Sequence, residues 1–149
     1  PRPRLEKAYR NYAMEYVKTA APVVVQLFGP EEGGHLLHLT GKLIGMQYFD
    51  EVAHALGQNK GGPKEFADFL LALFAAQDEA AEISRAGSAF EITQPAWKLM
   101  ADVGDDHPAC ARVLAGLFEG LAFGCGRHIP VDLRRSAGGN PPFVWTIGA

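Results

Sequence analysis

The sequence has few cysteines and lacks a long hydrophobic run, and both features limit what the protein can be. Cys110 and Cys125 are its two cysteines, too few for a disulfide framework, and they suit a reducing compartment. No apolar stretch reaches the roughly 18 residues that a membrane-spanning helix needs, and no charged-then-apolar leader opens the chain. We therefore expect a cytoplasmic protein that has no membrane partner.

The sequence also lacks an excess of basic charge. Its 17 acidic residues outnumber its 14 basic residues, which gives a net charge of -3. Proteins that bind nucleic acid through its phosphates carry a clustered basic surface, so we expect no nucleic-acid partner. Residues 1–4 are basic but too few to change this balance, and we expect them to form a disordered tail.

Motifs for cofactors and metals are missing as well. The glycines near the C-terminus follow a predicted helix instead of a strand, so they do not form a dinucleotide or phosphate loop, and we expect no cofactor. His35 and His38 share one side of a predicted helix, but no clear third ligand accompanies them. Surface histidines explain this spacing better than a metal site, and we expect no bound metal.

The spacing of the apolar residues predicts one α+β domain over residues 1–149. Apolar residues recur three and four positions apart in four segments, which predicts helices over 5–28, 30–56, 64–80 and 108–123. Alternating segments predict two hairpins, the first with a three-residue loop at 86–88 and the second at 129–147. The predicted fold therefore has N-terminal helices, then hairpin, helix and hairpin, and its small antiparallel sheet packs on the helices.

Two of the predicted helices carry glycines four residues apart. Gly41 and Gly45 lie in the second helix, and Gly116 and Gly120 lie in the last one, which Gly124 is predicted to end. The larger apolar residues of the second helix are predicted to form its buried stripe: Leu36, Leu39, Leu43, Met46 and Val52. A neighbour can approach the glycine faces closely, which indicates tight packing. We also expect a homodimer, because the sheet has one face patterned for the core and a mixed other face, and the glycine-smoothed helices could also pack across a two-fold axis.

Glycines and apolar residues over several segments resemble a known superfamily. The segments are FGPEE at 28–32, LAGLFEG at 114–120, IPV at 129–131, SAGG at 136–139 and FVW at 143–145. They are similar to the bacteriochlorophyll 4-vinyl-reductase-like domains and the L-2-amino-thiazoline-4-carboxylate hydrolase family. The resemblance implies a dimer-prone α+β fold with a small-molecule pocket between helices and sheet.

The chain departs from that superfamily at the positions where relatives carry strand cysteines and, in the hydrolase branch, an aspartate. The corresponding positions here hold Ser136, Phe143 and Val144. None of them supplies a thiolate ligand, so the sequence predicts no cysteine-bound zinc site. The same departures count against a direct transfer of the hydrolase activity.

Three residues are candidates for catalysis, and one for holding a ligand charge. Cys125 and His128 follow the last predicted helix, where an imidazole could activate a thiol; a packed cysteine beside a surface histidine is the alternative. Glu91 could act as a general base if burial raises its pKa. Arg134 could hold a carboxylate in bidentate geometry. An ordinary solvated sheet face explains Glu91 and Arg134 better than these roles, and a dimer contact is a further alternative for Arg134.

Three further residues are candidates for contact with a ligand. Trp97 and Trp145 could line an aromatic pocket for a small planar molecule, or pack in the core. Cys110 lies on the apolar face of the last helix, where it contacts a ligand or serves as a small hydrophobic residue.

Three functions follow from these observations. The first is a small-molecule enzyme, a hydrolase acting on a sulfur- or nitrogen-containing metabolite, with Cys125, His128 and Glu91 as its catalytic residues. The second is a small-molecule-binding or sensor domain without chemistry. The third is a subunit whose sheet or glycine-rich helices mediate assembly.

Overall fold

A computed structural model describes residues 2–95, 108–126, 128–135 and 143–148 of the chain. The described helices are α1 (Arg2–Phe28), α2 (Pro30–Ala55), α3 (Pro63–Ala76) and α4 (Pro108–Cys125). The described strands are β1 (Glu82–Ala86), β2 (Ala89–Gln94), β3 (Val131–Arg135) and β4 (Phe143–Ile147). The predicted α+β class and the order of helices, hairpin, helix and hairpin are confirmed.

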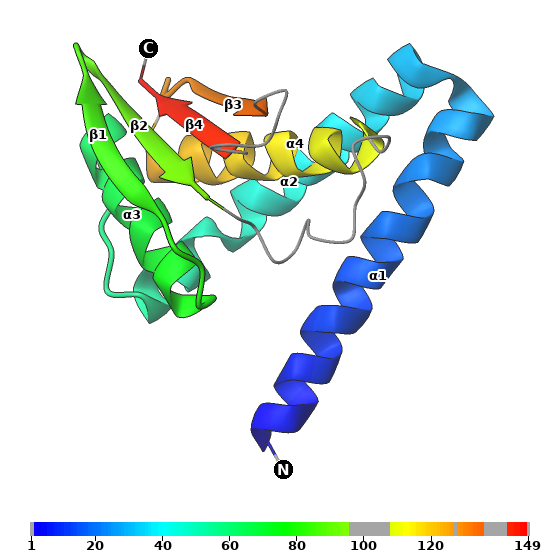
Figure 1. The fold of residues 1–149 in the computed structure, drawn as a ribbon, viewed down its shortest axis with the longest axis horizontal. Helices are drawn as coiled ribbons and strands as arrows, with labels where there is room; N and C mark the ends of the chain where they lie inside the picture. Colours follow the sequence, from blue (N-terminus) through cyan, green and yellow to red (C-terminus); the bar gives the residue numbers. More distant parts are fainter. Residues whose placement is uncertain (1, 96–107, 127, 136–142, 149) are drawn as a thin grey trace.

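The four strands form one antiparallel sheet in the order β1-β2-β4-β3, so the two hairpins meet along β2 and β4. In the central row Ile92 pairs with Trp145, which pairs with Leu133 on the far strand. Figure 1 shows α3 and α4 against one face of the sheet, α2 crossing α4, and α1 extending away from the rest of the molecule.

Aromatic side chains fill the space between the sheet and the helices. Phe118 of α4 lies against Trp145, with ring centres 4.2 Å apart, and Phe74 of α3 packs against both rings. Phe66 and Phe69 continue the core along α3 and are fully buried. This core orients α4, and α4 in turn carries part of the candidate site.

Glycines bring α2 and α4 into backbone contact. A Cβ atom added to Gly41 would lie 2.1 Å from the carbonyl oxygen of Val113, and one added to Gly45 would lie 2.1 Å from that of Leu117. Gly116 and Gly120 form the matching surface of α4. The predicted close packing at the glycine faces is confirmed. Because the two faces pack on each other within one chain, they are not available to pack across a two-fold axis.

The predicted buried stripe of α2 was wrong. Four of its five members are exposed, by 39% to 52% of their surface: Leu36, Leu39, Leu43 and Met46. The fifth, Val52, packs against the core. The residues buried along α2 are instead mostly small: Gly33, Gly34, Leu37, Gly41, Gly45, Phe49 and Ala53. The helix has two apolar faces on opposite sides, and periodicity alone does not say which one packs internally.

Several predicted boundaries shift by a few residues for local reasons. The third helix stops at Ala76, before the predicted residue 80, and Asp78 adopts a left-handed backbone at φ 62°. The first hairpin turns through two residues instead of three, with Gly87 at φ 65°. Such a backbone suits glycine and the tight turns that connect adjacent strands.

The last predicted helix extends past its predicted glycine cap. It runs to Cys125, so Gly124 lies inside α4, where an added Cβ would come 2.5 Å from the Cβ of Phe49. Gly124 is therefore needed for packing between α4 and α2 and not for ending the helix. Among the described residues, no helix has the length and apolar character that crossing a membrane requires.

Candidate functional site

Cys125 and His128 lie close in sequence but face different surroundings. Cys125 is only 2% exposed, and its Sγ atom points to the carbonyl oxygen of Asn59 at 4.0 Å. Burial raises the pKa of the Cys125 thiol, and the hydrogen bond donated by the Gly61 backbone offsets this only in part. His128 is exposed, with a left-handed backbone at φ 65°. No hydrogen bond joins these two described residues, and the thiol is held in its neutral form.

Glu91 and Arg134 lie on the sheet face directed away from the helices. Glu91 pairs with Ser84 on one side and with Thr146 on the other, and Thr146 pairs with Asp132. The Nε atom of Arg134 donates to the Oδ2 atom of Asp132 at 3.2 Å, and both side chains are exposed. The fold thus places these two candidates on another surface from Cys125 and His128.

The remaining candidates lie in the core or outside the described residues. Trp145 is fully buried, and its Nε1 donates to the Oε1 of Gln94 at 2.8 Å. Cys110 is buried with its Sγ 4.0 Å from the carbonyl oxygen of Val17, and burial raises the pKa of its thiol. Trp97 lies outside the described residues. Trp145 and Cys110 are therefore core residues.

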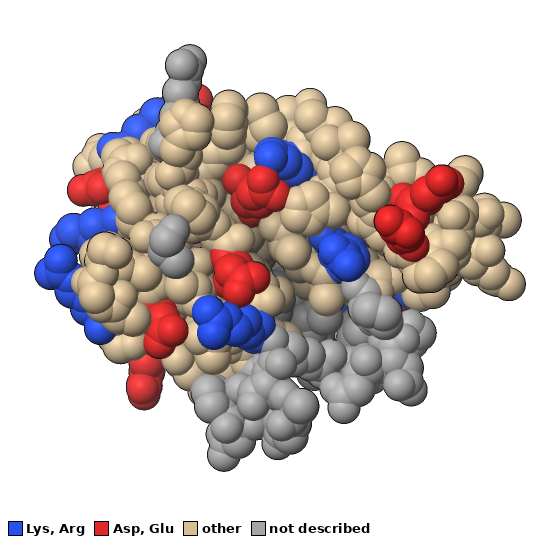
Figure 2. Space-filling model, turned by 90° about the horizontal axis from the view of Figure 1, so that it is seen from above, with Lys and Arg blue, Asp and Glu red and all other residues tan. Residues whose placement is uncertain are grey.

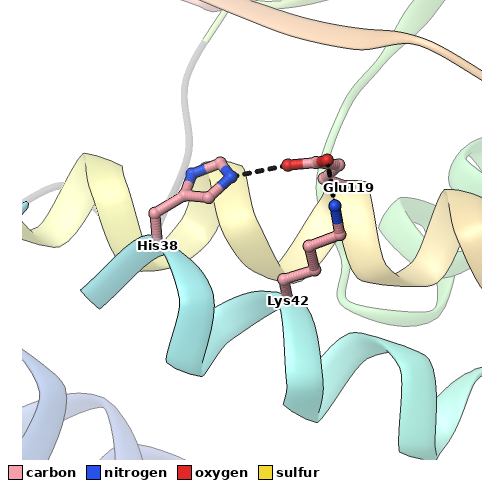
Figure 3. A network of polar contacts seen from close by, with 3 residues as sticks. All are labelled: His38, Lys42 and Glu119. Carbon is pink, nitrogen blue, oxygen red and sulfur yellow. Dashed lines mark hydrogen bonds and ion pairs between the residues drawn. The ribbon is translucent and has the colours of Figure 1, made fainter. Parts of the chain in front are cut away.

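A different group of polar residues meets where α2 crosses α4. Glu119 of α4 receives two contacts from α2, as Figure 3 shows. Its Oε2 atom lies 2.5 Å from Nε2 of His38, and its Oε1 atom accepts a hydrogen bond from Nζ of Lys42 at 2.5 Å. Each of the three side chains is about one-third exposed. The carboxylate thus has one partner on each oxygen and remains open to solvent.

The glycine contact between the helices positions this network. A Cβ atom added to Gly116 would lie 1.9 Å from the carbonyl oxygen of His38, and one added to Gly120 would lie 2.1 Å from that of Lys42. Glu119 stands beside Gly120 in the sequence and projects at the edge of the contact. The absence of side chains at the two glycines lets His38 and Lys42 reach one carboxylate.

The ionisation of Glu119 reflects two opposing effects. Partial burial pushes its pKa upward, but the hydrogen bonds and electrostatic attraction from Lys42 and His38 outweigh burial and hold the pKa of Glu119 below its ordinary value. The carboxylate is therefore charged at neutral pH. A charged carboxylate with bound donors can orient an imidazole and an ammonium group toward a ligand.

A surface pocket of about 390 Å³ opens beside the network. Lys42, Glu119 and His128 supply its polar groups, while Phe123, Ile129 and Pro130 supply an apolar wall. Pockets for small molecules commonly have this size and combine an apolar wall with a few polar groups. The pocket brings His128 together with the Glu119 network and does not include Cys125.

The face of the molecule that Figure 2 draws carries charge of both signs. Figure 2 shows basic and acidic side chains interspersed over the visible face, without a broad patch of either sign. Among the described residues, no three His, Cys, Asp or Glu side chains gather where they could hold a metal ion.

The sequence did not predict a role for Lys42 or Glu119, and it favoured a surface position for His38 over a metal ligand. Two signals were present. Glu119 and Arg112 are the two charged residues in the segment 108–125, and Glu119 stands directly beside a glycine of the smooth face. His38 and Lys42 are four residues apart and so share a side of their helix. Recognising the site required knowing that the two glycine faces meet.

No protein-family model matches the sequence, and no curated protein matches it.

Proposed function

We propose that the protein binds a small polar metabolite in the pocket beside Glu119. The observation that carries this proposal is the carboxylate of Glu119, which lines the pocket together with Lys42 and contacts both Lys42 and His38. Charged groups held in fixed positions next to an apolar wall are typical of sites that orient small ligands. The resemblance to a superfamily of small-molecule-binding domains supports the same role.

The chemistry of the pocket favours an anionic ligand with a compact apolar part. The ammonium group of Lys42 has three donors, of which one is given to Glu119, so two remain for a ligand carboxylate. His128, on another wall, adds a donor or acceptor. Phe123 and Ile129 suit a short carbon skeleton or a small ring. A carboxylate metabolite containing sulfur or nitrogen meets these requirements.

A second candidate function is hydrolysis of such a metabolite, supported by the pairing of His38 with Glu119. A carboxylate that accepts from one imidazole nitrogen fixes the ring and leaves the other nitrogen to take a proton from water. The hydrolase branch of the resemblance favours this reaction. In this proposal His38 replaces Cys125 as the reactive group, because burial and a raised thiol pKa disfavour a thiolate nucleophile.

We further propose that the protein is a cytoplasmic homodimer. Both cysteines are free thiols, as suits a reducing compartment.

Native mass spectrometry of the purified protein tests the binding proposal. We expect a retained small molecule, and we expect the Lys42→Met and His128→Ala variants to lose it while remaining folded. The matched control is Lys64→Met, which removes an exposed lysine paired with Asp68 on α3 and is expected to retain the ligand. Equal retention in all variants would place the ligand elsewhere.

The hydrolase proposal has its own assay. L-2-amino-thiazoline-4-carboxylate is incubated with wild-type protein and with the His38→Gln variant, and its consumption is followed by mass spectrometry. Consumption by the wild type and a loss of at least about 100-fold in the variant are expected for a general base. Equal rates of consumption in the two proteins would overturn His38 as the base, and no consumption by the wild type would leave binding as the only role.

A further inference from the structure

The outer face of α1 carries a regular apolar stripe. Its members are Leu5, Tyr9, Tyr12, Tyr16, Val23 and Leu27. At about 100° per residue they fall within about 60° of the helix circumference, opposite the buried Ala21. Spacings of four and three residues between Leu5 and Tyr16 are those of a coiled-coil seam. The stripe is therefore patterned for another helix, yet it faces solvent.

The side chains that the structure describes in the first half of α1 are open to solvent. Every described side chain between residues 5 and 16 is exposed, and Figure 1 shows this half projecting away from the body. Tyr12, the most exposed of its large apolar residues, has 79% of its surface open. An isolated helix of about 12–15 residues is only marginally stable in water. Residues 5–16, here called the α1 arm, need a packing partner.

The outer face of α2 carries a second stripe that matches the arm. Leu36, Leu39, Leu43 and Met46, here called the α2 stripe, occupy about 80° of the helix circumference opposite Gly41. Their spacings of three, four and three residues also follow a coiled-coil seam. Four residues span about 15 Å on α2 and four span about 16 Å on the arm. The two stripes are thus alike in length and repeat.

Charge at the ends of the two stripes is complementary. In the sequence, residues 2–10 contain Arg2, Arg4, Lys7 and Arg10 against one acidic residue. Glu31 and Glu32 stand in the first turn of α2, and with His35 and Leu36 they line a hollow of about 610 Å³. Figure 2 shows the α1–α2 end of the molecule as mostly uncharged surface with one acidic cluster. The sequence at the start of α1 is therefore opposite in charge to the acidic residues beside this hollow.

The exposed apolar area is also what a dimer requires. A tyrosine side chain offers about 150–250 Å², and Tyr9, Tyr12 and Tyr16 are each 65% to 79% exposed. With the leucines and Met46, the two stripes expose on the order of 800 Å² in each copy, which is the usual contribution of one partner to a stable interface. Monomeric proteins rarely expose contiguous apolar patches beyond a few hundred Å².

We propose that the α1 arm of each copy lies along the α2 stripe of a second copy, with the N-terminal end of the arm over Glu31 and Glu32. This inference assigns a contact surface to the homodimer proposed above and is independent of the pocket ligand. The exchange is reciprocal, so both stripes of both copies are buried in one isologous interface. Leu5 then lies near Leu36 of the second copy, and Tyr16 near Met46.

Light scattering with single variants tests the surface. Wild type is expected to be a dimer at micromolar concentration, and Tyr12→Lys and Leu39→Lys are each expected to raise the dissociation constant by at least about tenfold, because each buries a charge in the interface. Ile83→Lys, at an exposed apolar residue of β1, is the matched control and leaves the dimer intact. Circular dichroism confirms folding, since all three side chains are exposed in the single chain.

The outcomes separate the proposals. A monomeric wild type would overturn both the homodimer and this interface. A monomer that sediments with anionic vesicles would overturn them in the same way. A dimer that resists Tyr12→Lys and Leu39→Lys would overturn the interface and leave the homodimer. Neither result bears on ligand retention in the pocket.

Disulfide trapping tests the direction of pairing. The Leu5→Cys/Leu36→Cys protein is expected to form a covalent dimer under mild oxidation, and the Leu5→Cys/Met46→Cys protein is not. The native cysteines are buried and do not compete. Trapping only of the second pair would overturn the proposed direction.

Discussion

α2 has two apolar faces, and the fold uses them in opposite ways. The face with Gly41 and Gly45 touches the backbone of α4, so one added carbon atom at either position would collide with it. The opposite face carries large apolar residues and remains exposed. The two helices approach closely because glycine has no side chain to keep their backbones apart. Backbones that touch along two helices then gain many dispersion contacts.

The largest expected effect comes from filling the glycine face. Gly116→Ala places a Cβ atom against the carbonyl oxygen of His38, and moving α2 away from α4 should lower the free energy of unfolding by about 3 kcal/mol. Urea denaturation measures the loss. Thr40→Ala, on an exposed part of α2, is the control and should change stability by at most about 0.5 kcal/mol. A mild effect at Gly116 would mean that the two helices are not in close contact.

The next largest effect is expected on the alkylation rate of Cys125, at the end of α4. Cys125 is covered and its thiol pKa is raised, so its alkylation by iodoacetamide at pH 8 should be at least about tenfold slower in native than in urea-unfolded protein. Peptide mass mapping separates it from Cys110, which is expected to be protected as well. Fast native labelling of Cys125 would restore it as a candidate nucleophile.

Replacing Glu119 should have a smaller effect on the free energy of unfolding, and this effect should depend on pH. Its pKa is lower in the folded chain than its ordinary value of about 4.5, so its stabilising contribution is present above that pH and is lost as pH falls through the folded pKa. After allowance for solvent screening, Glu119→Gln should cost about 0.5 kcal/mol at pH 7. Denaturation of both proteins from pH 7 to pH 3 should show the difference shrinking below about pH 4.5. A difference that persists at pH 3 would argue against an ionised Glu119 as its source.

The smallest effect on the single chain is expected on the exposed face of α2. Leu43→Ser should change the unfolding midpoint at the lowest protein concentration by an amount equivalent to at most about 0.5 kcal/mol. The rise of the wild-type midpoint with concentration should vanish in this variant, since that rise reports dimerisation. A loss above about 2 kcal/mol at every concentration would show that Leu43 is buried within one chain.

The sequence predicted the elements of this fold well because their signals are local. Three- and four-residue spacing located all four described helices, and alternation located both hairpins. The sequence did not predict which faces of the helices pack against each other. Leu36 and Leu39 look like core residues by hydrophobicity, and only the contact between α2 and α4 shows that the glycines take the inner position.

The candidate site was harder to predict for the same reason. Cys125 and His128 are near each other in the sequence, but the helix end turns the thiol inward and leaves the imidazole outside. Lys42 and Glu119 are 77 residues apart, and no local pattern joins them. Glu91 and Arg134 were placed correctly on the outer sheet face by alternation, which by itself carries no information about a pocket.

The central claim is that Lys42 and Glu119 belong to a binding pocket for an anionic metabolite. Thermal unfolding with a panel of small sulfur- and nitrogen-containing carboxylates tests it most directly. A ligand at 100 times its dissociation constant should stabilise the wild type and the Lys64→Met control by about 2.7 kcal/mol, and should not stabilise Lys42→Met at the same concentration. Equal stabilisation of Lys42→Met, or no stabilisation of the wild type by any member of the panel, would contradict the claim.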